Sequence, residues 1–287
     1  MELIKPILAF MYDFDKTLSP KDMQEFTFLP NLGINDPDDF WKETSKIAVD
    51  GNMSTVSAYM YLMLKKSREK GIRITRQSFV SIGKDVELFK GVDTWFKRIN
   101  NYAKEKGAVV EHYIISSGIK EIIEGTSISN EFKEIYASSY YYEENGVAAW
   151  PAFAIDFSSK TQCLFRINKG FLSLNDNRVN NYVKETDRRI PFKNMIYIGD
   201  GFTDVPCMKL VKVNGGQSVV VYKPNSKKSE DNAKKLFNDD RVCFLTSADY
   251  SEGKEMEQIA FKVIDKIKVD NEIEKIYRKH ESISQQK

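Results

Sequence analysis

The sequence predicts an α/β protein in which a parallel β-sheet is flanked by helices. Short apolar runs rich in β-branched and aromatic residues recur at positions 7–12, 109–115, 195–198, 219–222 and 242–245, and stretches with helical spacing separate them. Strands that alternate with helices pair in parallel, because each crossover helix returns the chain to the same edge of the sheet. Acidic residues directly after the first and third runs lie where such a sheet carries its functional loops.

The long interval between the first two strands predicts a helical insertion. Apolar residues recur there at helical spacing over residues 40–49, 55–66 and 76–89. We therefore expect a main α/β domain formed by residues 1–18 and 91–287, interrupted by a helical domain of residues 19–90.

Two further elements complete the prediction. Residues 136–142 and 147–157 form a β-hairpin pattern, in which Asn145-Gly146 supplies the positive φ that the turn requires. Residues 252–280 have apolar side chains on one face of a helix, which predicts a late amphipathic helix.

Composition limits the classes of function. The 287 residues, 41% hydrophobic and 12% aromatic, suffice for one large domain or two smaller ones. The 43 basic and 41 acidic side chains leave a net charge of +2, which argues against a general affinity for nucleic acid or an anionic membrane. Three widely spaced cysteines indicate reduced thiols, and the amino-terminal segment lacks the pattern of a signal peptide. We expect a cytoplasmic protein; the sequence does not indicate its oligomeric state.

The first acidic motif is DFDKT at residues 13–17, at the end of the first strand. Asp13 and Asp15 are two positions apart, so in an extended segment their side chains point the same way. Neighbouring carboxylates repel each other unless a positive charge lies between them, so the pair suggests a cation site or an acid/base pair. The alternative interpretation is a solvated strand end followed by a turn.

A second acidic cluster, GDGFTD at residues 199–204, follows the third strand. If the three strands are neighbours, Asp13, Asp200 and the hydroxyl of Ser116 converge on one crevice at the carboxyl edge of the sheet. Ser116-Ser117-Gly118, expected before a helix that begins near residue 119, offers hydroxyl and backbone N–H groups to a phosphate oxygen, and Ser117 is the alternative to Ser116.

A lysine completes the predicted site. Lys160 begins a predicted helix and could add a fixed positive charge, whereas Lys169 is the competing candidate deeper in the same helix. Carboxylates, a hydroxyl and a lysine are the groups that hold Mg²⁺ and a phosphoryl group together. Asp204 either supports this site or only caps a helix.

With these residues in order, the sequence resembles the haloacid dehalogenase superfamily, whose four motifs it contains. They are DFDKT at 13–17, the strand YIIS ending at Ser116, Lys160, and GDGFTD at 199–204. The resemblance implies a Rossmann-like core with an inserted α-helical cap of the C1 type, here residues 19–90. Within the superfamily, the sequence is most similar to the phosphoserine phosphatase branch.

The resemblance also implies a mechanism. Asp13 would attack phosphorus and form an aspartyl-phosphate, and Asp15 would protonate the leaving group and then activate water. Mg²⁺ would be held by Asp13, Asp200 and, through its backbone carbonyl, Asp15. Ser116, with Ser117 beside it, and Lys160 would bind phosphoryl oxygens. Thr17 and Asp204 would have supporting roles.

The implied function is a phosphatase acting on a small phosphorylated metabolite. The alternatives are a phosphotransferase or phosphomutase of the same superfamily, and a binding module that keeps the fold. In the phosphoserine branch a glutamate after the first motif and an arginine on the cap hold the amino acid. Here Asp22 lies near the glutamate's place and Arg68 is the candidate for the arginine, so the substrate itself stays open. Phe26 and Trp41 are further candidates for specificity.

Overall fold

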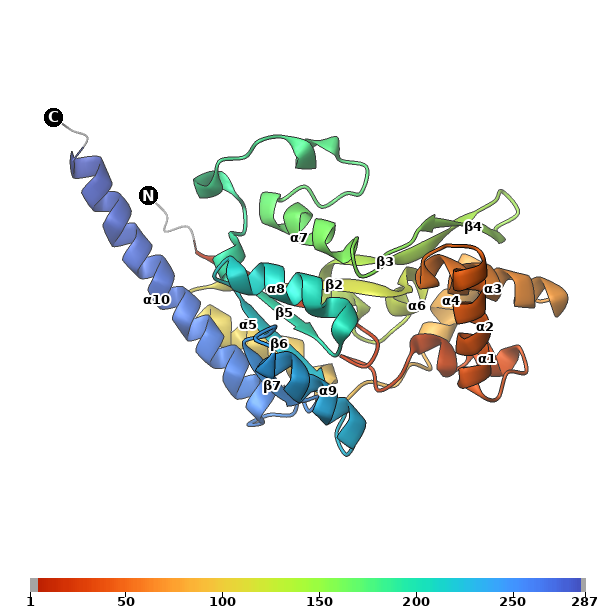
Figure 1. The fold of residues 1–287 in the computed structure, drawn as a ribbon. Helices are drawn as coiled ribbons and strands as arrows, with labels where there is room; N and C mark the ends of the chain where they lie inside the picture. Colours follow the sequence, from red (N-terminus) through yellow and green to blue (C-terminus); the bar gives the residue numbers. More distant parts are fainter. Residues whose placement is uncertain (1–4, 285–287) are drawn as a thin grey trace.

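The computed structural model describes residues 5–284, so the first four and last three residues of the predicted main domain lie outside the described chain. Within it, one sheet has the strand order β4-β3-β2-β1-β5-β6-β7, parallel except for β4 (Figure 1). The strands are β1 (Ile7–Tyr12), β2 (Val109–Ile119), β3 (Phe132–Tyr142), β4 (Ala148–Phe153), β5 (Met195–Gly199), β6 (Gln217–Tyr222) and β7 (Phe244–Ser247). The predicted Rossmann-like α/β fold is confirmed.

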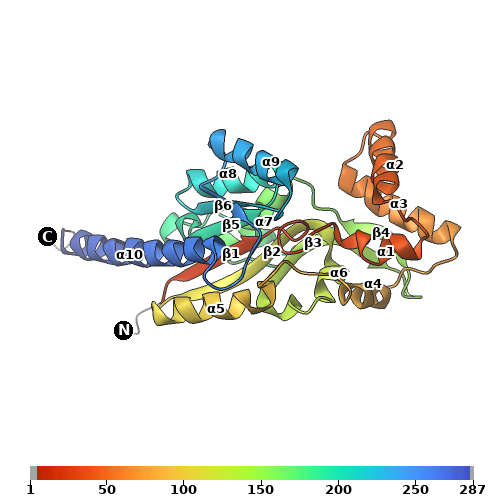
Figure 2. The same cartoon turned by 90° about the horizontal axis from the view of Figure 1, so that it is seen from below.

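Helices cover both faces of the sheet because its central strand is apolar on both sides. Leu8, Phe10 and Tyr12 of β1 pack in the same core cluster as α5 (Val92–Glu105) and α10 (Glu255–Ser284). Ala9 and Met11, which point the opposite way, pack with α7 (Lys160–Lys169), α8 (Val205–Val213) and α9 (Lys227–Asn238). Figure 2 shows these two helical layers on either side of the sheet.

The interval between β1 and β2 is helical, as expected. Before α5, its elements are the 3-10 helix η1 (Met23–Glu25) and the helices α1 (Phe28–Asn31), α2 (Pro37–Asp50), α3 (Thr55–Glu69) and α4 (Arg76–Gly83). The side chains of Asp36, Ser54 and Thr75 cap the amino-terminal ends of α2, α3 and α4. Helices α1 to α3 lie beyond one end of the sheet (Figures 1 and 2), where the carboxyl end of β1 also lies.

Helix α4 packs closely on α6 (Lys120–Glu124), which connects β2 to β3 of the sheet. A Cβ on Gly83 would lie 2.1 Å from the carbonyl oxygen of Ile122, and a Cβ on Gly125 would lie 1.9 Å from that of Val80. Only glycine permits this backbone approach.

The remaining short 3-10 helices are η2 (Ser129–Glu131), η3 (Asn177–Asn180), η4 (Glu185–Asp187), η5 (Phe192–Asn194) and η6 (Phe202–Asp204).

The predicted hairpin is confirmed as the antiparallel pair β3 and β4, and Gly146 has a positive φ of 74° in its turn. Tyr140 is buried and donates a hydrogen bond of 2.8 Å to the carbonyl oxygen of Met60 in α3. The hairpin thereby holds α3 near the sheet. Tyr141, which points to the opposite face, is exposed.

Some predicted boundaries shift. Strand β2 continues to Ile119, with an irregular register between Ile115 and Ile119, and α6 begins at Lys120. Residues 116–118, which were expected between the second strand and a helix, are therefore part of an irregular strand end, because β2 pairs with β3 again where Ile119 lies opposite Ser138. The late helix α10 begins at Glu255 and, in the described chain, ends at Ser284. In the described part of the chain, no helix combines the length and apolar character that crossing a membrane requires.

A buried histidine in β2 makes a testable contribution to stability. Tyr12 Oη lies 3.0 Å from Nδ1 of His112, while Nε2 of His112 lies 3.1 Å from the side-chain oxygen of Asn100. Trp95 donates to the same Tyr12 oxygen, so Tyr12 donates to His112 and a neutral imidazole protonated on Nε2 satisfies every contact. Burial lowers the pKa of His112 to about 3.

Because the folded state resists protonation of His112, its contribution to stability is complete above pH 6.5 and is lost as the pH falls below that value. We expect this residue alone to lower the free energy of unfolding by about 1.4 kcal/mol between pH 7.5 and 5.5. Urea unfolding of His112→Gln should therefore show a smaller pH dependence than wild type. The same substitution at the exposed His280 is the matched control, and equal pH dependence in wild type and His112→Gln would contradict the assignment.

Candidate active site

The site is built at the carboxyl ends of three adjacent strands. Strand β1 lies between β2 and β5, so Asp13, Ser116 and Asp200 come from neighbouring strand ends. The backbone N–H of Asp13 donates to the carbonyl oxygen of Ile198 at 2.9 Å, which fixes the start of the first loop against β5. These three residues line one pocket of about 710 Å³ together with Asp15 and Lys160.

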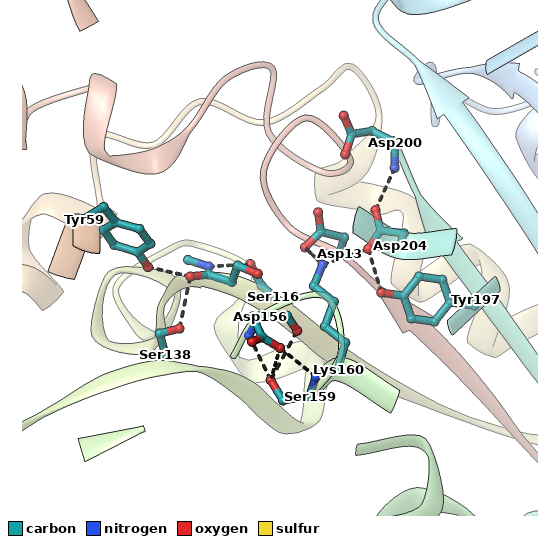
Figure 3. Close-up of polar contacts among 12 residues, drawn as sticks. Asp13, Tyr59, Ser116, Ser138, Asp156, Ser159, Lys160, Tyr197, Asp200 and Asp204 are labelled. Atoms are coloured by element: carbon teal, nitrogen blue, oxygen red, sulfur yellow. Dashed lines mark hydrogen bonds and ion pairs between the residues drawn. The ribbon is translucent and has the colours of Figure 1, made fainter. Parts of the chain in front are cut away.

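Lys160 is the cationic centre of the pocket floor. Its ammonium donates to Oδ1 of Asp13 at 3.0 Å and to Oδ1 of Asp204 at 2.8 Å (Figure 3). Lys160 is only 1% exposed. Burial by itself lowers its pKa, but the two carboxylates outweigh burial and hold the pKa of Lys160 above its ordinary value. The side chain therefore carries a fixed positive charge.

Asp13 is an ionised carboxylate at neutral pH in a buried setting. Burial raises its pKa to about 6, and the charge of Lys160 opposes that rise. A carboxyl group with this pKa is mostly ionised at pH 7.

Asp15 has a different environment. Its Oδ1 accepts a hydrogen bond of 2.8 Å from the backbone N–H of Met23. Burial, followed by the charges of Asp22 and Asp13, holds the pKa of Asp15 well above its usual range. The two carboxyl groups of this short motif thus have different hydrogen-bond partners, Lys160 for Asp13 and the backbone of Met23 for Asp15.

Asp204 lies beneath the pocket and accepts hydrogen bonds from the groups that form its floor. Tyr197 donates to its Oδ1 at 2.8 Å, and its Oδ2 accepts from the backbone N–H of Asp200 at 3.3 Å (Figure 3). Asp204 is completely buried, and its carboxylate holds both Lys160 and the loop that carries Asp200. Its cap position at the start of α8 comes without a side-chain capping bond.

A carboxylate cluster suited to a cation lies at the same place. One carboxylate oxygen from each of Asp13, Asp200 and Asp204 lies within 4.8 Å of the others. Burial, and then the charges of Asp204 and Asp13, hold the pKa of Asp200 well above its usual range. Asp15 is predicted to bind the metal through its backbone carbonyl; its side chain is not in this group and accepts a hydrogen bond from the backbone N–H of Met23.

The end of β2 brings hydroxyl and backbone groups to the pocket. Ser116 Oγ accepts from the backbone N–H of Gly118 at 3.0 Å, and the carbonyl oxygen of Ser117 accepts from the hydroxyls of Tyr59 and Ser138 (Figure 3). Both serines line the pocket. At Gly118 a Cβ would lie 2.1 Å from Cε of Met23 and 3.0 Å from Oδ2 of Asp15, so this glycine permits the first loop to approach.

The other predicted residues take different places. Asp22 and Trp41 line the pocket, whereas Phe26 packs against the core and Arg68 is exposed on α3 outside the pocket. Thr17 is fully buried, and its carbonyl oxygen accepts from Tyr250 at 2.9 Å.

Of the two candidate lysines for the third motif, Lys160 lines the pocket and Lys169 does not. Lys169 donates to the carbonyl oxygens of Val179 and Asn181, at 2.7 and 2.8 Å, and does not line the pocket.

Sequence reasoning missed several residues that line this pocket. Gln24 and Tyr59 come from helical segments whose apolar periodicity does not distinguish a pocket face from a core face. Asp156 had a local signal, since its Oδ1 accepts from the backbone N–H groups of Ser158 and Ser159. An aspartate two or three residues before serines at a helix start is typical of such a turn.

Comparison with known proteins decides the family. The family described as haloacid dehalogenase-like hydrolase matches residues 10–209, which is most of the chain. The chain belongs to the haloacid dehalogenase-like hydrolase family. This membership confirms the resemblance recognised from the four motifs, all of which lie inside the matched segment.

Relatives of this haloacid dehalogenase-like hydrolase extend the comparison. An uncharacterized protein of Borreliella burgdorferi is 29% identical over 277 residues, covering 87% of this chain and 94% of the relative. A solved phospho-aspartyl intermediate analogue of phosphoserine phosphatase is 12% identical, with a TM-score of 0.52 over 89% of this chain and 98% of that one. An HAD family hydrolase from Salmonella enterica serovar Typhi is 16% identical, with a TM-score of 0.51, and the match spans 77% of this chain and 63% of that one. At these identities the two structures show a shared fold.

Proposed function

We propose that this protein is a Mg²⁺-dependent phosphomonoester hydrolase that works through an aspartyl-phosphate on Asp13. The observation that carries the proposal is that Asp13, whose Oδ1 accepts a hydrogen bond of 3.0 Å from Lys160, and Asp15 line one pocket. A candidate nucleophile and a candidate general acid are thus present together, and burial raises the pKa of Asp15 in the direction that a general acid requires. We further propose a cytoplasmic location and a small phosphorylated metabolite as substrate.

The donor set fits a hard divalent cation. Carboxylate oxygens are the ligands that Mg²⁺ prefers. One carboxylate oxygen from each of Asp13, Asp200 and Asp204 lies within 4.8 Å of the others, and a cation would offset the repulsion among them. Asp13 and Asp200 would hold the ion, with the backbone carbonyl of Asp15 as a further ligand. When bound, Mg²⁺ would offset the repulsion between the carboxylate of Asp13 and the anionic phosphate.

The residues divide the reaction between them. A carboxylate oxygen of Asp13 attacks phosphorus, the ester P–O bond breaks, and the proton of Asp15 goes to the leaving alkoxide. Asp15 then takes a proton from the water that attacks the aspartyl-phosphate, which releases inorganic phosphate and regenerates Asp13. Lys160 and Ser116 bind the phosphoryl oxygens, where charge develops in the transition state.

The helical domain of residues 19–90 has the role of a cap in this proposal. Tyr59 of α3 and Trp41 of α2 line the pocket from that side, so movement of these helices would open and close the site. Closure would exclude water while the leaving group departs.

The test is release of inorganic phosphate from p-nitrophenyl phosphate in the absence of any acceptor alcohol. We expect phosphate and nitrophenol in equal amounts with Mg²⁺, almost none after treatment with EDTA, and recovery when Mg²⁺ is restored. Turnover that survives EDTA would contradict the metal requirement. Phosphate release that depends on an added alcohol or sugar phosphate would instead identify a phosphotransferase or mutase.

A further inference from the structure

The charges that line the pocket disfavour an anionic leaving group. The lining acids are Asp13, Asp15, Asp22, Asp156 and Asp200, and the lining bases are Lys16 and Lys160. Both lysines already contact carboxylates, Lys16 at 2.7 Å from Asp22 and Lys160 at 3.0 Å from Asp13. The described pocket lining contains no arginine or histidine. A substrate carboxylate or second phosphate would therefore meet negative charge without a cation of its own.

One buried amide in this pocket lacks a partner. Gln24 is only 2% exposed and lines the pocket, yet its side-chain oxygen Oε1 has no hydrogen-bond partner. A buried carbonyl oxygen without a donor is costly, so a ligand that supplies an N–H group would satisfy it.

Aromatic side chains form the wall of the pocket next to the inserted helices. The rings of Trp41 and Tyr59 meet edge to face, with centroids 5.9 Å apart, and both line the pocket. Phe157 also lines it and is 57% exposed, so its ring is available to a ligand. Aromatic faces attract organic cations.

Another acidic side chain, that of Glu25, lies beside this wall. Burial, and then Asp22, raise the pKa of Glu25, whose carboxylate lies 3.5 Å from the indole nitrogen of Trp41. The ammonium of Lys16 lies beside Asp22.

We propose that the substrate is the phosphomonoester of an amino alcohol that carries a primary ammonium group and no carboxylate. The ammonium donates to Oε1 of Gln24 and lies in the field of Asp22, while the rings of Trp41 and Tyr59 bound the leaving group. This inference rests on the proposed phosphatase activity and adds the class of leaving group.

Four substrates test the inference on the wild-type enzyme with Mg²⁺: O-phosphoethanolamine, O-phosphocholine, O-phosphoserine and glycerol 2-phosphate. We expect kcat/KM to be at least about 10-fold higher for O-phosphoethanolamine than for each of the others, because a hydrogen bond to a charged group is worth at least that factor. If O-phosphoserine is hydrolysed as well as O-phosphoethanolamine or better, the pocket does accept a substrate carboxylate and the inference is wrong. Equal or better hydrolysis of O-phosphocholine, which has no N–H, would overturn the role of Gln24.

Gln24→Leu separates recognition from catalysis. We expect it to raise KM for O-phosphoethanolamine about 10-fold and to leave KM for glycerol 2-phosphate unchanged, with Gln258→Leu on the exposed side of α10 as the matched control. An equal loss on both substrates would overturn the assignment.

Calorimetric titration of the Asp13→Asn variant with O-phosphoethanolamine and with O-phosphoserine measures the two binding affinities without turnover of the ligand. Tighter binding of O-phosphoethanolamine is expected, and equal binding overturns the inference. If p-nitrophenyl phosphate is hydrolysed but no amino alcohol ester is preferred, this inference fails while the phosphatase proposal stands. If no ester is hydrolysed, the phosphatase proposal fails, and the titration still decides the ligand class.

Discussion

Replacing Asp13 with asparagine is expected to lower kcat for p-nitrophenyl phosphate by about 10⁴-fold or more, because the amide cannot form the covalent intermediate. The amide oxygen can still accept a hydrogen bond from Lys160, which lies 3.0 Å from Oδ1 of Asp13. The pocket should therefore keep its shape while it loses its nucleophile. Steady-state release of nitrophenol with saturating Mg²⁺ measures the effect.

Asp39→Asn is the matched control for this prediction. Asp39 lies on α2 with 76% of its side chain exposed, and it does not line the pocket. We expect wild-type turnover from this variant. Turnover by Asp13→Asn at the wild-type rate would disprove Asp13 as the nucleophile.

Replacing Lys160 with methionine is expected to lower the free energy of unfolding by about 3 to 5 kcal/mol, measured in urea at neutral pH without divalent metal. Lys160 contacts both Asp13 and Asp204, which are 6% and 0% exposed. Its removal leaves two buried carboxylates without their shared counter-charge. The same variant should lose most of its activity, since the phosphoryl oxygens lose a fixed cation.

Acid should partly rescue the stability of Lys160→Met. The carboxylates can then take up protons, so we expect the difference from wild type to shrink between pH 8 and pH 5. Lys169→Met is the comparison, because Lys169 contacts backbone carbonyl oxygens and no carboxylate among its hydrogen-bond partners. If Lys169→Met were as damaging to activity as Lys160→Met, the assignment of the phosphate-binding lysine would have to be reversed.

The local elements could be predicted from the sequence because the signals that specify them are local. The apolar run of β1 is buried from Leu8 to Tyr12, and the acidic motif follows it directly in the chain. A strand and the loop after it are joined covalently, so a motif at a strand end lies at the edge of the sheet. The parallel arrangement followed from the alternation of strands and helices.

Contacts between distant parts of the chain could not be predicted in this way. Lys160 and Asp13 are 147 positions apart in the chain. The packing of α7 against the sheet brings the ammonium of Lys160 to the carboxylate of Asp13, whereas the ammonium of Lys169 lies elsewhere. The irregular end of β2 depends on its pairing with β3. A short window of residues specifies neither the contact between Lys160 and Asp13 nor the register of β2 against β3.

For this protein, the sequence by itself determined the order of the strands along the chain, the acidic motifs at their ends and, through those motifs, the family. The tertiary structure decided which lysine meets Asp13, which carboxylates crowd together and which side chains of the inserted helices face the pocket. The physical reason is that backbone propensity and covalent adjacency act over a few residues, whereas burial, charge pairing and the unpartnered amide of Gln24 arise when remote segments pack together.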